Sequence, residues 1–407
     1  MERRKFLNAI KDTVVAGCFL SHPVFAQVAL SGPRRWSQGE NELAYHTIAK
    51  VAFDRVELKW PRKVGKNARL DVHGDGSSAD VCIITTDKGA IGWGMVRGRK
   101  NAGELVSKLS GKKVSEVFSP QAGVTDLAYL PFDIALHDLA GIILEKPVYA
   151  LMGRETPLVT DCYSGMIYFD DLEPEGNPAG IDKILEECRY DYDFGYRQFK
   201  LKIGRGNKWM PKNQGLKRDI EVTKAVARHF PQCAILVDGN NGFTAAEFIR
   251  YMEGIGDIAL FWIEEPFHET EADYRQLKDW LVANNISTLL ADGEHDPDEA
   301  LLRDLAKKKL IDVHLTDIIG YGFTPWRRLM PELQKTGTLA SPHAWGTLLK
   351  THYIAHLAGA LGNTVTIEGV TCTSDDVDLS GYKLENGKLI PPPTPGFGMR
   401  LLKNGMI

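Results

Sequence analysis

The chain has 407 residues, of which 43% are hydrophobic and 25% are charged, and this composition is typical of a globular protein with room for one large and one smaller domain. Its formal net charge of −4 leaves no excess of cationic side chains, so we do not expect nucleic acid as a partner. After residue 30 no apolar run reaches the roughly 18 to 20 residues that a membrane-spanning helix needs, so we expect no membrane span there.

Residues 1–26 have the order of an export signal. Arg3 and Arg4 begin a cationic segment, which a mildly apolar stretch follows up to Ala26. Paired arginines followed by x-Phe-Leu resemble a twin-arginine signal, so we expect an exported, periplasmic protein that is cleaved after Ala26. Lipidation of Cys18 and an amphipathic terminal helix are the alternatives. The six cysteines are scattered and predict no disulfide framework, which agrees with export of an already folded chain.

Residues 27–45 are largely polar and contain Gly, Pro and Ser, so they read as a linker. The next segment, 46–157, is predicted to be a small α+β domain. Alternating apolar and polar residues predict three antiparallel strands in it, at 48–58, 79–86 and 90–96. Apolar residues at spacings of three and four predict two helices, at 102–109 and 130–144.

Residues 158–384 alternate between short apolar runs and helical segments. The runs are 162–167, 198–203, 234–237, 260–263, 288–290, 312–315, 338–340 and 365–367. Eight β/α units in this length predict a closed (β/α)8 TIM-like barrel. An open doubly wound sheet is the competing fold, but it would need a Gly-rich phosphate loop where Ser164-Gly165-Met166 stands. Residues 204–218 read as an extended loop, and 385–407 as a C-terminal segment that returns to the first domain.

Ionisable residues end several of the predicted strands. Lys200 and Lys202 are two residues apart, so the alternation of a strand points both side chains the same way. Asp238, Glu264 and Glu294 follow three later strands. Each of these residues, taken alone, is more often a solvated strand end or a turn residue. Three carboxylates at one rim of a barrel would repel one another unless a cation neutralised them, and an all-oxygen ligand set favours Mg²⁺ over zinc.

An acid and an imidazole follow the sixth and seventh predicted strands. Neighbouring strands bring Asp317 and His343 within hydrogen-bonding reach, and a carboxylate on one ring nitrogen raises the basicity of the other. A lone histidine at a strand end is usually structural, but His343 would face the two lysines across the barrel. Glu368 ends the eighth strand.

With these residues the chain resembles the enolase superfamily, in its mandelate racemase-like subgroup, over nearly all of residues 46–400. Residues 133–141, Asp-Ile-Ala-Leu-His-Asp-Leu-Ala-Gly, resemble the helix that leads out of the family's capping domain, although His137 stands where Trp is common. The resemblance implies a (β/α)8 barrel with an N-terminal α+β cap and one Mg²⁺ per active site.

Individual roles follow from the same resemblance. Lys202 is implied as the base on one face of the substrate, and His343 with Asp317 as the dyad on the other. Lys200 and Glu368 are implied to stabilise charge on the substrate carboxylate, and Asn240 to contact its α-substituent. The metal ligands are implied to be Asp238, Glu264 and Glu294. Lys202 must be neutral to act as a base, and Lys200 together with the metal would lower its pKa.

This arrangement predicts removal of the proton α to a carboxylate, in the way the superfamily combines a Lys or His base with Mg²⁺. The family contains many sugar-acid dehydratases, so we expect a hydro-lyase that converts a sugar acid to a 2-keto-3-deoxy acid. The alternatives are a racemase or epimerase of a 2-hydroxy acid, a non-catalytic binding relative and a phosphate-binding barrel enzyme. We also expect a homo-oligomer.

Specificity is expected to lie in the cap. Basic residues cluster at 59–69 and at 97–100, where they would attract an anionic substrate or simply form solvated loops. Tyr163 and Trp345 are candidates for lining the substrate pocket, although core packing is the commoner role for an aromatic residue at a strand end.

Overall fold

The computed structural model describes residues 38–402. The predicted export signal, Cys18 included, and residues 27–37 of the predicted linker therefore lie outside the described residues. Within them, no helix combines the length and the apolar character that crossing a membrane requires.

The linker prediction is wrong for its last eight residues, which form helix α2 (Gln38–Tyr45). Leu43 of this helix is only 1% exposed and belongs to the main hydrophobic core. A short surface helix buries only one narrow face, so most of its residues are polar. The burial of Leu43 alone does not produce the repeat of apolar residues every three or four positions by which a helix is recognised in a sequence.

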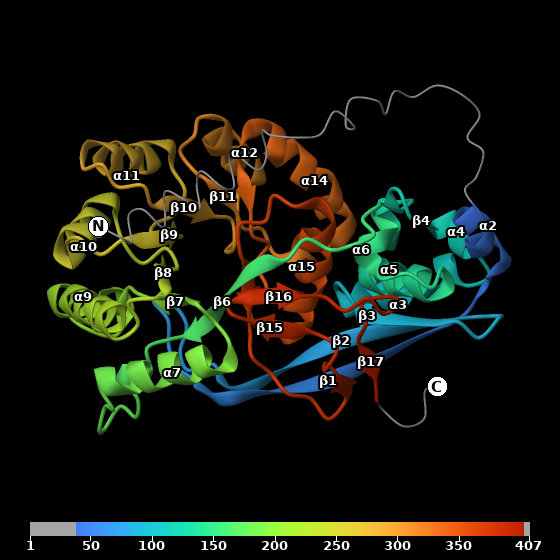
Figure 1. Ribbon diagram of the computed structural model, residues 1–407, viewed down its shortest axis with the longest axis horizontal. Coiled ribbons are helices and arrows are strands. Elements are labelled where there is room, and N and C mark those ends of the chain that lie inside the picture. The colour runs from blue at the N-terminus through green and yellow to red at the C-terminus, as the bar shows by residue number, and fades with distance from the viewer. Residues whose placement is uncertain (1–37, 403–407) are drawn as a thin grey trace.

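The cap is built on an antiparallel meander, β1 (Ile48–Val64), β2 (Gly74–Thr86) and β3 (Ile91–Met95), as predicted. Both β1 and β2 extend further than expected, and Figure 1 shows them as a long ribbon that reaches from the cap helices to the β6–β7 side of the barrel. The short loop between them, 65–73, is thereby carried to the mouth of the barrel.

Helices pack against this meander. Both predicted helices form: α3 (Arg99–Leu109) and α5 (Asp133–Ile143). The second begins three residues later than predicted, because a 3-10 helix, η1 (Leu127–Phe132), contains Pro131. Smaller elements complete the cap: α4 (Val114–Val117), β4 (Phe118–Ser119), β5 (Gly123–Val124) and α6 (Val148–Leu151).

The eight predicted parallel strands all form and close into a barrel. They are β6 (Thr160–Ile167), β7 (Gln198–Lys202), β8 (Ala234–Asp238), β9 (Leu260–Glu264), β10 (Leu289–Asp292), β11 (Val313–His314), β12 (Leu339–Ala340) and β13 (Ile367–Gly369). Closure comes from pairing of β13 with β6, where Ile367 lies opposite Cys162, and from a parallel bridge between Ala340 and Thr364.

Helices cover the outside of the barrel: α7 (Ile181–Phe194), α9 (Lys212–His229), α10 (Ala245–Ile255), α11 (Glu271–Ala283), α12 (Glu299–Lys307), α14 (Phe323–Thr336) and α15 (Leu348–Leu361). Local sequence sets several of their starts. Thr244 and Glu247, for example, form a capping box at the first turn of α10, which satisfies backbone N–H groups that the helix leaves free.

The extended loop predicted at 204–218 is wrong, because this stretch forms α8 (Arg205–Lys208) and the start of α9. Arg205 is fully buried and pairs with Asp171 at 2.6 Å and Asp219 at 2.7 Å. These partners come from two other places in the chain, so the sequence around Arg205 carries no sign of the network that fixes the turn.

The end of the chain forms two small antiparallel pairs, β14 (Val377–Asp378) with β17 (Arg400–Leu401) and β15 (Lys383–Glu385) with β16 (Lys388–Ile390), so these pairs join the predicted segment from residue 385 onward to residues that precede it. It also reaches the cap, where the backbone N–H of Phe397 donates to Asp138 at 2.8 Å.

Candidate active site

The register of three neighbouring strands places Lys202, Asp238 and Glu264 side by side across the sheet. Lys202 lies opposite Asp238 across β7 and β8, and Asp238 lies opposite Glu264 across β8 and β9. Glu294 follows β10. Asp238, Glu264 and Glu294 each offer one oxygen, and these oxygens all lie within 4.8 Å of one another. The strands therefore deliver the three predicted ligands to a single point at the barrel mouth.

This cluster fits a hard divalent cation. It is all-oxygen and mostly buried, and Glu264 Oε2 and Glu294 Oε2 are buried without a hydrogen-bond partner among the described residues. Burial, together with the neighbouring carboxylates, raises the pKa of Glu264 well above its usual range despite the opposing effect of Lys200. Buried carboxylates with unused oxygens are costly, and a cation would relieve that cost.

The two lysines on β7 both point into this cluster, as the strand alternation predicted. Lys200 Nζ lies 2.7 Å from Glu264 Oε1, 2.9 Å from Glu368 Oε1 and 3.5 Å from Asp238 Oδ2. Lys202 Nζ forms a short hydrogen bond with Asp238 Oδ2 and lies 5.3 Å from the centre of the Tyr168 ring. Both lysines are at most 3% exposed.

One electrostatic expectation is reversed in this structure. Burial alone would lower the pKa of Lys202, but the Asp238 carboxylate outweighs burial and raises that pKa above its usual range. The charges around Lys202 therefore favour its protonated form here, because the Asp238 carboxylate is its direct partner. Lys200 lowers the pKa of Lys202, as predicted, but its effect on that pKa is smaller than the opposite effect of Asp238.

His343 and Asp317 meet as predicted. A parallel bridge joins the two residues, and His343 Nδ1 lies 3.2 Å from Asp317 Oδ2. The other ring nitrogen lies 3.2 Å from Glu294 Oε1 and 3.6 Å from Glu368 Oε2. Burial favours the neutral imidazole, but Glu294, Glu368 and Asp317 together raise the pKa of His343 to about 10.

Glu368 connects the two sides of the site. One oxygen pairs with Lys200, and the other accepts a hydrogen bond from the backbone N–H of Ala344 at 2.7 Å. Asn240 lies in the left-handed region with φ 41°, where its N–H donates to Asp238 Oδ1 at 2.8 Å. Its side-chain oxygen is buried without a partner among the described residues, so it is available to a ligand.

The two predicted aromatic residues lie in different surroundings. Tyr163 is 2% exposed and packs edge-on against Trp262 at 5.2 Å inside the barrel, below Lys200, and that packing does not support its predicted substrate contact. Trp345 is half-buried and stacks near Tyr168 at 4.8 Å and Trp60 at 5.4 Å. It therefore belongs to an aromatic wall beside Lys202.

Much of the basic character of the cap is neutralised internally. Arg62 forms a bidentate pair with Asp191 at 2.8 Å, Lys66 pairs with Glu173 at 2.9 Å, and Arg99 pairs with Asp80 at 2.8 Å. These residues tie the cap to the barrel or to itself, so their sequence clustering did not indicate a substrate-attracting surface.

Sequence reasoning missed several residues around the site, namely Trp60, His73, Tyr168 and Lys350. Lys350 Nζ lies 2.7 Å from Asp317 Oδ2, on helix α15. Only Tyr168 of these four directly follows a barrel strand, β6. Trp60 and His73 come from the cap and Lys350 comes from a helix, so neither strand-end position nor motif spacing marks those three.

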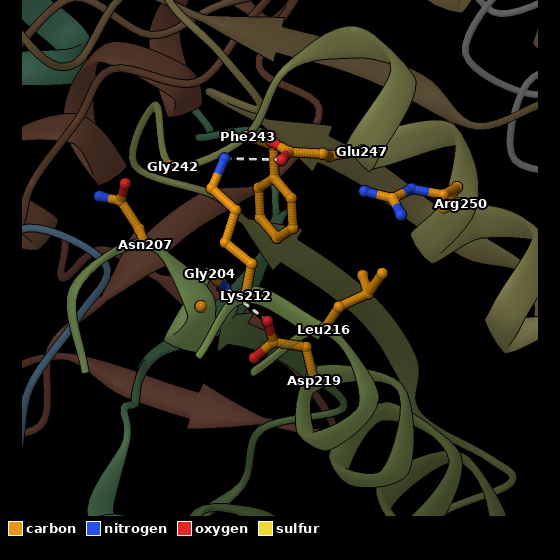
Figure 2. A pocket seen from close by; sticks show the side chains of 10 residues that line it. Gly204, Asn207, Lys212, Leu216, Asp219, Gly242, Phe243, Glu247 and Arg250 are labelled. Carbon is orange, nitrogen blue, oxygen red and sulfur yellow. Dashed lines mark hydrogen bonds and ion pairs between the residues drawn. The ribbon is translucent and has the colours of Figure 1, made fainter. Parts of the chain in front are cut away.

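A small pocket lies beside this site, behind the end of β7. Figure 2 shows Lys212 and Glu247 facing one another across it, with Asn207, Phe243 and Arg250 around it. Its cavity is about 20 Å³, which is room for about one water molecule. None of the metal-ligand or acid/base candidates lines it, so it is not the substrate site.

Comparison with known proteins agrees with this geometry. Residues 183–404 match the family described as enolase C-terminal domain-like. The chain is 26% identical to an arabinonate dehydratase of Saccharolobus solfataricus, over 65% of this chain and 67% of that protein. A crystal structure of galacturonate dehydratase from Geobacillus sp., complexed with D-galacturonate and 5-keto-4-deoxy-D-galacturonate, superposes with a TM-score of 0.82 at 32% identity, covering 88% of this chain and 95% of that one.

A second solved structure carries a metal. It is a mandelate racemase/muconate lactonizing protein from Geobacillus sp. Y412MC10, complexed with magnesium and tartrate, with a TM-score of 0.82 at 32% identity over 88% of this chain and 93% of that one.

Proposed function

The chain belongs to the enolase superfamily, in its mandelate racemase-like subgroup, and from this premise we propose that it is a Mg²⁺-dependent sugar-acid dehydratase. The substrate is a small carboxylate, and the product is a 2-keto-3-deoxy acid. One observation carries the proposal: Lys202, at the end of β7, and His343, in the loop after β12, approach the same three-carboxylate cluster, Lys202 through Asp238 and His343 through Glu294.

Asp238, Glu264 and Glu294 would hold the Mg²⁺, which when bound would supply positive charge beside the substrate carboxylate, where negative charge develops as the α-proton leaves. Lys200, between Glu264 and Glu368, adds a fixed cation at the same place. These groups are buried, and a buried charge acts more strongly on developing charge than it would in water.

Proton transfer falls to the two groups on either side of the cluster. Lys202 is the base for a proton on its face of the substrate, and His343, oriented by Asp317, is the acid/base on the other face. For dehydration, one group takes the α-proton and the other protonates the departing β-hydroxyl. Return of a proton to carbon would instead give racemisation or epimerisation, which remains the second candidate because the same two groups serve it.

The test is to incubate the purified Mg²⁺-loaded protein with a panel of sugar acids in D₂O while measuring keto acid and α-deuterium together. Dehydration predicts keto acid, and racemisation predicts deuterium with inversion at C2. A Lys202→Ala variant removes one base, and a Glu332→Gln variant, on the exposed face of α14, is the matched control. If neither product forms with the unaltered protein, the enzymatic proposal is wrong.

We also propose that the protein is exported to the periplasm and acts as a homo-oligomer. The paired Arg3 and Arg4 and the small residue Ala26 support export. The cysteines support it as well, because all five that the structure describes are buried and Cys82, Cys162, Cys188 and Cys372 are free thiols, as expected of a chain that crosses the membrane after folding.

A further inference from the structure

The cap loop 65–73 is fastened to the barrel at several points. Trp209 Nε1 donates to the carbonyl of Asn67 at 2.6 Å, Asn207 Nδ2 donates to the carbonyl of Ala68 at 2.9 Å, and the backbone N–H of Phe169 donates to the carbonyl of Lys66 at 2.9 Å. The loop therefore has a fixed position over the ends of β6 and β7.

His73 ends this loop and lies beside the reacting groups. Its ring is 4.8 Å from the ring of Tyr168 and 5.9 Å from that of Trp345, edge-on to both. Tyr168 in turn lies 5.3 Å from Lys202 Nζ. Only one aromatic ring thus separates the cap histidine from the proposed base.

Hydrogen bonding fixes the roles of the two His73 nitrogens. Nδ1 lies 2.7 Å from the carbonyl oxygen of Gly65, and because a carbonyl only accepts, Nδ1 carries the proton. Burial lowers the pKa of His73, and the positive charge of Lys202 lowers it further, so the neutral ring is favoured. In that state Nε2 has a free lone pair, and the structure gives it no protein partner among the described residues.

We propose that His73 is a specificity-determining residue, whose Nε2 accepts a hydrogen bond from a hydroxyl group of the sugar acid remote from the reacting carboxylate. This inference rests on the proposed function. A neutral acceptor fixed beside an aromatic wall suits the mixed polar and apolar surface of a polyhydroxylated chain. It disfavours a second carboxylate at the same place, because that group has no proton to donate.

Two substitutions separate substrate recognition from support of the loop. The amide of His73→Asn reaches the position of Nδ1, so it keeps a donor for Gly65 but places nothing at Nε2. The longer side chain of His73→Gln places its amide near Nε2 instead. If His73 reads a substrate hydroxyl, Gln retains function and Asn loses it, whereas a role in holding the loop gives the reverse order.

The experiment measures kcat and KM of the Mg²⁺-loaded variants with the sugar acid that the unaltered protein turns over best. We expect His73→Asn to raise KM about tenfold with little change in kcat, as loss of one ground-state hydrogen bond does, and His73→Gln to stay within about threefold. Single-position deoxy analogues then identify the hydroxyl. With the correct analogue, unaltered protein and His73→Asn should have the same KM.

The inference fails if His73→Asn matches the unaltered protein, if Asn is the better replacement, or if no deoxy analogue removes the difference between the two proteins. Absence of turnover by the unaltered protein on every sugar acid overturns the proposed function itself. Thermal unfolding of both variants shows whether a rise in KM reflects damage to the cap.

Discussion

Asp317 fixes His343 because its two oxygens have separate tasks. Oδ1 accepts from the backbone N–H groups of Ile319 and Gly320 and so begins the short helix α13 (Ile318–Tyr321). Oδ2 accepts hydrogen bonds from His343 Nδ1 and Lys350 Nζ. The pKa of Asp317 is held far below its usual range, since these cationic partners outweigh burial. The carboxylate thus stays ionised and keeps His343 Nδ1 as a donor.

Replacing this carboxylate tests the dyad. In Asp317→Asn the amide can still cap α13, but the charge that orients and supports the imidazolium is lost. We expect kcat for dehydration to fall by about 10² to 10⁴, the usual contribution of a general acid or base. Thermal stability should fall as well, because His343 and Lys350 lose their anionic partner. Steady-state kinetics with keto acid detection measures this.

Asp375→Asn is the control, because Asp375 is exposed and pairs with exposed Lys59. If Asp317→Asn and Asp375→Asn have the same kcat, Asp317 plays no part in the reaction. Substrates whose α-proton faces Lys202 should still exchange that proton in Asp317→Asn, since that side of the site is untouched.

At the scale of elements, the barrel could be predicted because each of its strands can be recognised from a short stretch of sequence. Each strand is a short apolar run, and the residue that ends it, Asp238 for example, necessarily reaches the barrel mouth once the strands are parallel. The same logic placed Lys202 and His343. Secondary structure and strand direction together were enough to assemble the metal and acid/base groups.

The rest depended on contacts between distant segments. Arg205 starts a helix because Asp171 and Asp219 surround it, and His73 enters the site because the β1–β2 ribbon is long. Neither the pairing of Arg205 nor the position of His73 can be predicted from the residues next to them in the sequence. The pairing of the basic cap residues could not be predicted for the same reason, since Asp191, the acid that binds Arg62, lies far along the chain on α7.

The seam between cap and barrel gives a prediction at this scale. Gly204 has φ +101°, and a Cβ added there would lie 2.8 Å from the Cβ of Ala68 in the cap loop. Gly204→Ala should therefore destabilise the fold by about 1 to 3 kcal/mol, through its backbone conformation, and raise KM by displacing the loop. Denaturant unfolding and substrate kinetics measure the two effects.

Gly153→Ala is the matched control. Gly153 also has a positive φ of +92°, but no atom of residues 38–402 lies within 4 Å of its added Cβ. Gly153→Ala should therefore lower the free energy of unfolding about as much as Gly204→Ala does through its backbone conformation, and it should leave KM unchanged. An equal rise in KM for both variants would show that the contact with Ala68 is unimportant for substrate binding.

For the whole molecule, the export that we propose is tied to folding by the buried thiols. Cys82, Cys162, Cys188, Cys233 and Cys372 are all buried, so a chain that folds before export would shield them from oxidation. We expect Arg3→Lys with Arg4→Lys to leave the unprocessed chain inside the cell, whereas the unaltered chain is recovered from the periplasm beginning at Gln27. Arg34→Lys with Arg35→Lys, a second arginine pair in the predicted linker, should change nothing.

Mass spectrometry of the two cell fractions decides among the possibilities for the N-terminus. A mature chain that begins with a lipidated Cys18 would replace cleavage after Ala26. A periplasmic chain that is insensitive to loss of Arg3 and Arg4 would rule out the twin-arginine route.

Metal binding should also be visible in the stability of the whole molecule. The three clustered carboxylates are drawn together by the folded barrel and are dispersed in the unfolded chain, so Mg²⁺ binds the native state preferentially. At a Mg²⁺ concentration about 100 times its Kd, this adds about 2.7 kcal/mol to the free energy of unfolding. Thermal unfolding with Mg²⁺ and with EDTA measures the increment.

Glu264→Gln should remove most of that increment, because it deletes a charged ligand, whereas Glu332→Gln on exposed α14 should keep it. The sign of the pH dependence follows from Glu264, whose pKa is raised by burial and by neighbouring carboxylates. Protons compete with the metal for this group, so the Mg²⁺ increment should shrink as the pH falls. An increment that is the same in Glu264→Gln and independent of pH would place the metal elsewhere, because a site built on these carboxylates cannot lose a ligand or gain a proton without losing affinity.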